Sequence, residues 1–192
     1  MPGWSGGFHD HLVPILILNI FGWVTWQGVP SGLSARLSRI HFFIGVAIAE
    51  ELLFRGFIFQ RLLSGIGQWP AQWIIASFFL LTHMNNLDLT GSIRILASAK
   101  IYLASTQFGL AYIRIHSLAI PPGHHFMANL MQGGVLGFGV SGTDQTGLLI
   151  PTFAEVPDWL TGEQFGFEAS IFGLFFVVIT LMLLYKWRPQ AG

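Results

Sequence analysis

Long apolar stretches alternate with short polar or turn-forming stretches along the chain, and this pattern predicts a series of helices. The tracts 12–29, 117–139 and 169–185 contain no Asp, Glu, Lys or Arg. A bilayer core about 30 Å thick needs roughly 20 apolar residues in a helix that crosses it. Each tract is close to that length, so the pattern predicts helices that span a membrane.

Segments rich in Gly and Pro mark where one predicted helix ends and the next begins. GVPSG, SGIGQWP and PPGHH contain the residues that most often interrupt or begin helices. Residues 31–39 are predicted to be a polar connector, and residues 140–168 a long loop. We expect about six helices, over approximately 12–29, 40–63, 70–84, 93–115, 121–139 and 169–187. No internal repeat is visible, and residues 1–192 are expected to form a single membrane domain.

The composition and charge agree with this interpretation and exclude several other classes. Hydrophobic residues make up 53% of the chain and charged residues 9%, whereas a soluble domain is about 25% charged. The predicted fold class is therefore all-α, a polytopic membrane helical bundle of about six transmembrane helices. The formal net charge is zero and the basic residues are scattered, so no nucleic-acid partner is expected. The absence of cysteine excludes thiol catalysis, disulfides and thiolate metal sites.

Three charged residues interrupt the apolar segment AEELLFRG at positions 49–56. An ionisable side chain at the centre of a bilayer costs at least about 2.5–3.5 kcal/mol on insertion scales. Glu51 and Arg55 are i and i+4 on one helix face, so they can pair, and a pair that only fixes helix packing is a sufficient explanation for them. One Arg cannot neutralise two carboxylates, however. Glu50 must find another partner or bind a proton, which suits a general base.

Two further segments bring polar groups into apolar surroundings. His83 ends the stretch SFFLLTH, and His125 and Asn129 are i and i+4 within HHFMANL. His124 points about 100° away from His125 on the same helix. Each feature alone is explained by packing or by interhelical hydrogen bonds. Together with the glutamates they supply, on three helices, the groups that activate water and hold an oxyanion.

Other functions remain open on the residues alone. The chain has no H-E-x-x-H and no G-x-S-x-G motif, so neither the helical zinc proteases nor the serine hydrolases are indicated. A zinc site from Glu50, His83 and His125 is chemically possible, but the spacing gives no positive signal for it. A non-catalytic membrane scaffold or interaction protein would keep the polar cluster for packing. A transporter would move protons through Glu50, although the matched half-repeats typical of transporters are missing.

Three segments resemble a known family. EELLFRG (50–56), FLLTH (79–83) and HFMAN (125–129) resemble, in order, the motifs E-E-x-x-x-R, F-x-x-x-H and H-x-x-x-N of the CAAX protease and bacteriocin-processing (CPBP, Abi) family of intramembrane endopeptidases. The resemblance covers approximately residues 40–185, which would form the catalytic core. Any one motif is weak, but three in order at helical spacing are fairly specific.

The resemblance implies a hydrolase and a role for each motif residue. Glu50 would be the base that activates the attacking water, and His83 would assist it. His125 and Asn129 would stabilise the oxyanion on the scissile carbonyl. The implied mechanism needs no cofactor, and zinc is the minority alternative.

The resemblance also implies supporting residues and partners. Glu51 and Arg55 would form the ion pair that sets the orientation of Glu50. The implied partners are the lipid bilayer and a hydrophobic or membrane-associated peptide substrate, and we expect a multi-pass protein of a bacterial plasma membrane. Because the chain is short beside the eukaryotic CAAX enzymes and lacks N-terminal helices found there, the resemblance implies peptide hydrolysis and leaves the specificity for prenylated substrates open.

Overall fold

The structure is a computed structural model of the chain, and it describes residues 6–84, 91–143, 145–162 and 165–187. Most of these residues are helical, so the prediction of a mainly α-helical fold is confirmed. The helices are α1 (Gly6–Ile20), α2 (Leu33–Leu53), α3 (Phe59–Ile66), α4 (Gln68–His83), α5 (Gly91–Ile115), α6 (Ile120–Asn129), α7 (Asp158–Thr161) and α8 (Ile171–Lys186). Two π-helical segments, η1 (Phe54–Ile58) and η3 (Leu130–Val135), and one 3₁₀ turn, η5 (Phe167–Ala169), are further helical elements of the described residues.

The first helix is shorter than predicted. α1 ends at Ile20 because Gly22 takes a left-handed φ of 70°. The N–H of Trp23 bonds to Leu18 O and that of Gly22 to Asn19 O, which together form a Schellman motif. The chain then leaves the helix in an extended conformation, so the second half of the predicted helix over 12–29 is wrong.

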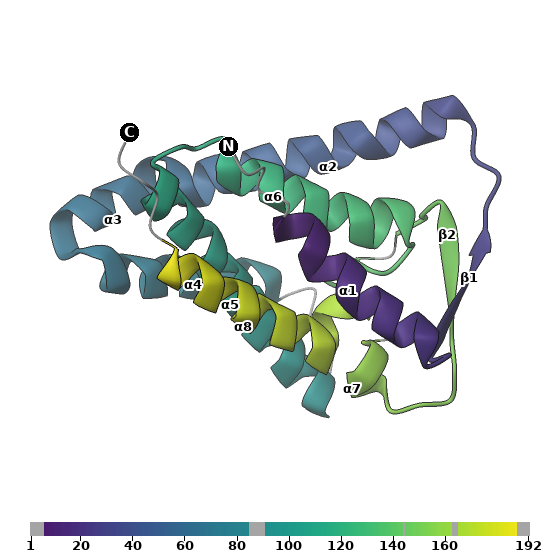
Figure 1. The fold of residues 1–192 in the computed structure, drawn as a ribbon. Helices are drawn as coiled ribbons and strands as arrows, with labels where there is room; N and C mark the ends of the chain where they lie inside the picture. The colour runs from purple at the N-terminus through teal and green to yellow at the C-terminus, as the bar shows by residue number, and fades with distance from the viewer. Residues whose placement is uncertain (1–5, 85–90, 144, 163–164, 188–192) are drawn as a thin grey trace.

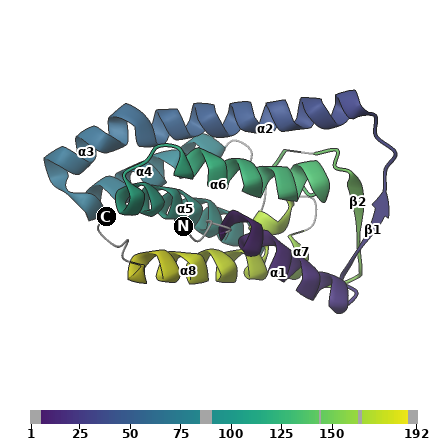
Figure 2. The same cartoon turned by 45° about the horizontal axis from the view of Figure 1, so that its top comes forward.

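A small antiparallel sheet, which the sequence analysis did not predict, follows α1. Strand β1 (Val24–Gly28) pairs with β2 (Leu149–Phe153), and Val24 lies opposite Phe153. The β-branched and aromatic side chains of both strands favour this conformation. β2 lies within the predicted loop 140–168, so this sheet fixes part of that loop. Figures 1 and 2 show the sheet at one end of the molecule and α3 at the other.

The helix that carries the glutamate pair starts earlier than predicted and is interrupted. α2 begins at Leu33, so the prediction of a polar connector over 31–39 is wrong. Leu33 and Leu37 are one turn apart, a spacing that supports a helix and was overlooked among the polar residues. Beyond α2 the chain enters η1, where Gly56 has a non-helical ψ of −118°. The predicted single helix over 40–63 is therefore two helices joined by a π-helical kink.

α5 contributes to most of the interior, because it packs against α4, α6 and α8. Gly109 permits close packing of α5 on α4, since a Cβ atom there would lie 2.0 Å from Gln72 Oε1. One apolar cluster fills the space around these helices; its fully buried members include Phe54, Phe59, Ile75, Phe79 and Ile101. α6 packs on the other side against α2. The three predicted motifs therefore lie on α2 with η1, on α4 and on α6.

Within the described ranges, no helix combines the length and the apolar character that crossing a membrane requires.

Candidate active site

Arg55 is the most completely buried charged residue of the candidate site, with no exposed surface. Its Nη1 lies 3.3 Å from Glu51 Oε1, so the pair that the i, i+4 spacing suggested is present. Its Nη2 donates to the carbonyl and to the hydroxyl of Ser105 on α5. The guanidinium carbon also lies 5.2 Å from the ring centroid of Phe79 and 5.4 Å from that of Phe108. Arg55 thus joins η1, α4 and α5 beneath the glutamate pair.

Glu51 has a second partner, which the sequence analysis missed. Its Oε1 atom lies 2.9 Å from Nδ1 of His125, on α6. Glu51 is 1% exposed, so this hydrogen bond forms in a dry interior. The two residues are 74 positions apart, and only the packing of α2 against α6 brings them together. Glu51 therefore connects Arg55 to His125 and does more than neutralise the arginine.

Glu50 lies on the more open side of the same helix turn. Its side chain is 29% exposed, and its Oε2 atom is 4.0 Å from His83 Nε2 and 3.9 Å from His125 Nε2. These distances exceed those of direct hydrogen bonds. Among the described residues, none donates a hydrogen bond to Glu50 Oε2. One carboxylate oxygen is therefore held between two imidazole nitrogens without being bonded to either.

Both imidazole rings present Nε2 to Glu50 because their Nδ1 atoms are engaged elsewhere. His83 Nδ1 lies 2.8 Å from Phe79 O, and a carbonyl only accepts, so Nδ1 carries the proton. His125 Nδ1 is held in the same way by the Glu51 carboxylate. Rings of Phe79 and Phe108 pack on the two imidazoles at 4.4 and 5.0 Å between centroids. Hydrogen bonds and ring contacts thus fix both tautomers and both orientations.

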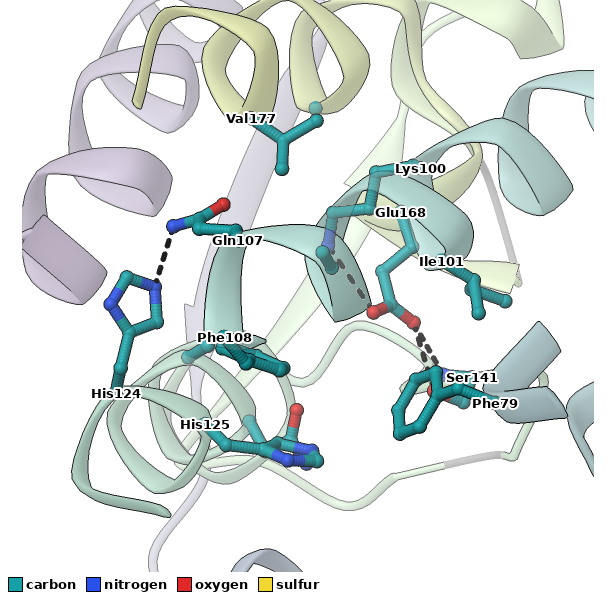
Figure 3. Close-up of a pocket in the computed structure, with 14 residues that line it drawn as sticks. Phe79, Lys100, Ile101, Gln107, Phe108, His124, His125, Ser141, Glu168 and Val177 are labelled. Carbon is teal, nitrogen blue, oxygen red and sulfur yellow. Dashed lines mark hydrogen bonds and ion pairs between the residues drawn. The ribbon is translucent and has the colours of Figure 1, made fainter. Parts of the chain in front are cut away.

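Asn129 and His124 occupy different surroundings on α6. Asn129 is 8% exposed and follows His125 by about one turn. His124 points in a different direction from His125, as expected (Figure 3), and its Nε2 accepts a hydrogen bond of 3.0 Å from the side-chain amide of Gln107. Within the described parts of the chain, His125 and Asn129 line a common cavity, which neither Glu50 nor His83 borders. The motif residues therefore do not all line this one cavity.

The chain's local structure is unusual at two of the motifs. The π-helical segment η1 begins three residues past Glu51 and contains Arg55, and η3 begins directly after Asn129. π-helical segments are rare and are frequent at functional sites, because the extra residue per turn changes where side chains point. Both interruptions lie beside the polar cluster. The geometry supports a site built on α2, α4 and α6 rather than polar residues buried independently.

A model of the Rce1-like family, described as type II CAAX prenyl endopeptidase Rce1-like, matches residues 32–131. The chain belongs to this family. The match covers more than half of the chain and includes every residue of the three motifs, which confirms the resemblance found in the sequence. No curated protein and no solved structure matches the chain significantly.

A second polar cluster, which the sequence analysis missed entirely, lies partly inside the matched range: Lys100 is within it, and Ser141 and Glu168 follow it. Lys100 on α5 and Glu168 on η5 are 6% and 8% exposed, and Nζ lies 3.2 Å from Oε1. The other oxygen of Glu168 accepts the Ser141 N–H at 2.6 Å and the Ser141 hydroxyl at 3.3 Å. A lysine in an apolar helix was the available signal, but its partner is 68 residues away.

The electrostatics of Glu168 favour its charged form. Burial alone raises the pKa of this carboxyl, but the Lys100 ammonium, the Ser141 N–H and His83 lower it. The balance leaves the pKa of Glu168 below the ordinary value of 4.5. At neutral pH Glu168 is therefore charged where it meets Lys100 inside the protein.

The cavity that His125 and Asn129 border reaches this ion pair (Figure 3). It has a volume of about 40 Å³ and lies between α5, α6 and α8. His124 and Gln107 lie at one end in Figure 3, and Lys100, Glu168 and Ser141 at the other. Apolar walls separate the two ends; they include Ile101, Ala104, Phe108, Ala128 and Val177.

The described residues contain no group of three or more His, Asp or Glu side chains arranged to hold a metal ion.

Proposed function

We propose that the protein is an intramembrane endopeptidase that hydrolyses a peptide bond with water activated by Glu50 and His83. The observation that carries this proposal is the position of Glu50 Oε2, 4.0 Å from His83 Nε2 and 3.9 Å from His125 Nε2. One water molecule can bridge groups at such separations. Membership of a family whose description is that of an endopeptidase supports the same reaction.

The first chemical step assigned to the site is proton transfer. A water bound beside Glu50 Oε2 gives a proton to the carboxylate while its oxygen attacks the scissile carbonyl carbon. His83 Nε2 carries a lone pair in the tautomer described above, so it accepts a hydrogen bond from the water's other O–H, which stays on the oxygen, and thereby orients that oxygen. The π bond of the carbonyl opens, and its electron pair becomes the oxyanion.

The oxyanion is assigned to α6. Asn129 offers a side-chain N–H, and His125 offers Nε2–H when its ring carries both protons. Since Nδ1 of His125 already faces the Glu51 carboxylate at 2.9 Å, that carboxylate supplies the negative charge that an imidazolium requires. The proton held by Glu50 then passes to the leaving amine as the C–N bond breaks.

The proposal places this chemistry within a lipid bilayer. Large apolar side chains are exposed along several helices, a feature that marks surfaces covered by membrane or by partners. On α2 and η1 they include Leu33, Leu37, Phe42, Ile48, Leu52 and Phe57, and on α8 they include Phe175, Met182 and Leu183. We therefore propose a multi-pass membrane protein whose substrates are hydrophobic or membrane-anchored peptides, with peptides ending in a CAAX sequence as the first class to test.

The direct test is cleavage of a membrane-anchored CAAX peptide by the purified protein in lipid vesicles. The peptide is offered with and without its prenyl group, and products are identified by mass spectrometry. The matched control is Glu50→Gln, which keeps the size and most hydrogen bonding of the side chain but cannot act as a base. We expect cleavage by the unaltered protein and none by the variant. Equal cleavage by both proteins, or no cleavage of any peptide by either, would overturn the proposed function.

A further inference from the structure

The cavity beside the motif residues is lined by a lysine, Lys100, which belongs to none of the three motifs. Lys100 extends from α5 into the wall of the cavity that also exposes His125 and Asn129 (Figure 3). A buried lysine is costly even when paired, because both ions lose their hydration. Its presence at this cavity, and not at the surface of α5, calls for a role beyond the local packing.

The hydrogen bonds of the pair are divided unequally. Glu168 accepts from Lys100, from the Ser141 N–H and from the Ser141 hydroxyl, so both of its oxygens are bonded. Lys100 Nζ has three N–H donors, and in the part of the chain that the structure describes it uses one of them, toward Glu168. The ammonium therefore has donor capacity left at the cavity, whereas the carboxylate is anchored to the chain around Ser141.

The shape and the chemistry of the cavity both indicate a small anionic group as its ligand. Its volume of about 40 Å³ suits a few atoms, and its middle is apolar between two polar ends. An ammonium in such surroundings bonds most strongly to an anionic oxygen. The same cavity is bordered by the side chains assigned to the oxyanion, and its small volume admits a terminal carboxylate beside Lys100 rather than a length of peptide.

We propose that Lys100 is a specificity residue, which binds the free α-carboxylate at the C-terminal end of the substrate, on the leaving-group side of the scissile bond. This rests on the proposed function, because a CAAX sequence lies at the extreme C-terminus of its protein and ends in a carboxylate. Glu168 and Ser141 are positioning residues, since they hold the ammonium in place and do not touch the ligand. The site distinguishes a chain end from an internal peptide segment.

The test compares two forms of one CAAX peptide, one with a free C-terminal carboxylate and one with a C-terminal amide. Binding of the fluorescently labelled peptides is measured with Glu50→Gln protein in vesicles, which isolates recognition from cleavage. Loss of a hydrogen bond to a charged group weakens binding by about tenfold or more. We expect the unaltered Lys100 to give that preference for the acid peptide. In Lys100→Met the acid and the amide should bind about equally, and Lys100→Arg should restore part of the preference. Lys186→Met, at the exposed end of α8, is the matched control and should keep the full preference.

A second variant separates recognition from folding. Lys100→Met strands the buried Glu168 carboxylate, whereas Lys100→Met with Glu168→Gln removes both charges, which a fold tolerates better. We expect the double variant to fold and to bind acid and amide equally. Glu168→Gln alone keeps the ammonium and an amide oxygen that still accepts from Lys100 Nζ and holds it in place, so this variant should keep the preference for the acid.

The outcomes also separate this proposal from the proposed function. Equal binding of acid and amide by the Glu50→Gln protein, or a preference that survives in the folded double variant, would overturn the carboxylate site and leave the endopeptidase assignment intact. If Glu168→Gln also loses the preference for the acid peptide, the effect comes from disturbing the buried pair, and Lys100 has a structural role and does not bind the carboxylate. An acid preference that depends on Lys100 in a protein that cleaves no peptide would support the carboxylate site and overturn the endopeptidase.

Discussion

Glu51 Oε1 lies 2.9 Å from His125 Nδ1 and 3.3 Å from Arg55 Nη1, so one carboxylate oxygen joins the arginine of the first motif to the histidine of the third. Glu51 thereby holds the ring whose Nε2 faces Glu50 at 3.9 Å. The adjacent glutamates have different surroundings, because Glu51 is 1% exposed while the Glu50 side chain is 29% exposed. The doubled glutamate thus combines a buried orienting group with a more open reactive group.

Replacing Glu51 by Gln should reduce kcat more than it changes KM. The amide oxygen still accepts from His125 Nδ1, but the negative charge that supports an imidazolium is gone. Loss of such an orienting partner typically costs about 10–100-fold in activity. Steady-state cleavage of the CAAX peptide in vesicles measures both constants. A rise in KM with unchanged kcat would contradict the orienting role of Glu51.

Glu50→Gln and Arg55→Ala should fail in different ways. The first should abolish cleavage and leave the unfolding temperature nearly unchanged, because Glu50 Oε2 is not bonded to any described residue. The second removes the fully buried partner of Glu51, and breaking a buried ion pair costs about 3–5 kcal/mol. Folded yield and thermal unfolding followed by circular dichroism separate the two. Equal losses of folded protein in both variants would favour the scaffold interpretation.

Asn129→Ala should slow the chemical step without weakening substrate binding. A donor to an oxyanion acts mainly in the transition state, and its removal lowers kcat by about 10²–10³-fold. His124→Ala is a useful comparison, since His124 bonds to Gln107 and has no assigned role in the proposed reaction. We expect a much smaller loss of kcat in that variant. Similar losses at both positions would argue against a specific role for Asn129.

The zinc alternative is decided by removing metal. If Glu50 and His83 activate water directly, cleavage should survive exhaustive chelation and dialysis. Metal content and activity are measured on the same preparations, because a zinc enzyme would lose both together and regain activity with added zinc. His83→Ala and His125→Ala would then also lose bound metal. That result would replace the glutamate mechanism while leaving an endopeptidase.

The Lys100–Glu168 pair should make stability depend on pH in a defined direction. The folded-state pKa of Glu168 is lowered, so its stabilising contribution is fully present above the ordinary carboxyl value of 4.5. It is lost as the pH falls through the lowered value. We expect the unfolding temperature of the unaltered protein to exceed that of Glu168→Gln at pH 7, and the difference to shrink below about pH 4.5. A difference that is constant with pH would show that Glu168 is not charged in the folded protein.

The local sequence was enough to predict most helices, because their apolar spacing and Gly/Pro boundaries depend only on neighbours. The local sequence did not predict elements whose pairing partners lie far away along the chain. The strand Val24–Gly28 is extended because it pairs with Leu149–Phe153, and nothing near residue 24 specifies that partner. It also failed at Gly56, where a π-helical kink interrupts an otherwise regular helical pattern.

In the candidate site, too, some features follow from local spacing and others only from tertiary packing. The spacing of Glu51 to Arg55 and of His125 to Asn129 determined by itself which groups share a helix face, since a helix repeats every 3.6 residues. The motifs also identified the family. Only the tertiary structure decided that Glu51 binds His125 and that Lys100 pairs with Glu168, across 74 and 68 residues respectively. These contacts depend on how α2, α5, α6 and η5 pack, and packing is a property of surfaces that meet only after the chain has folded.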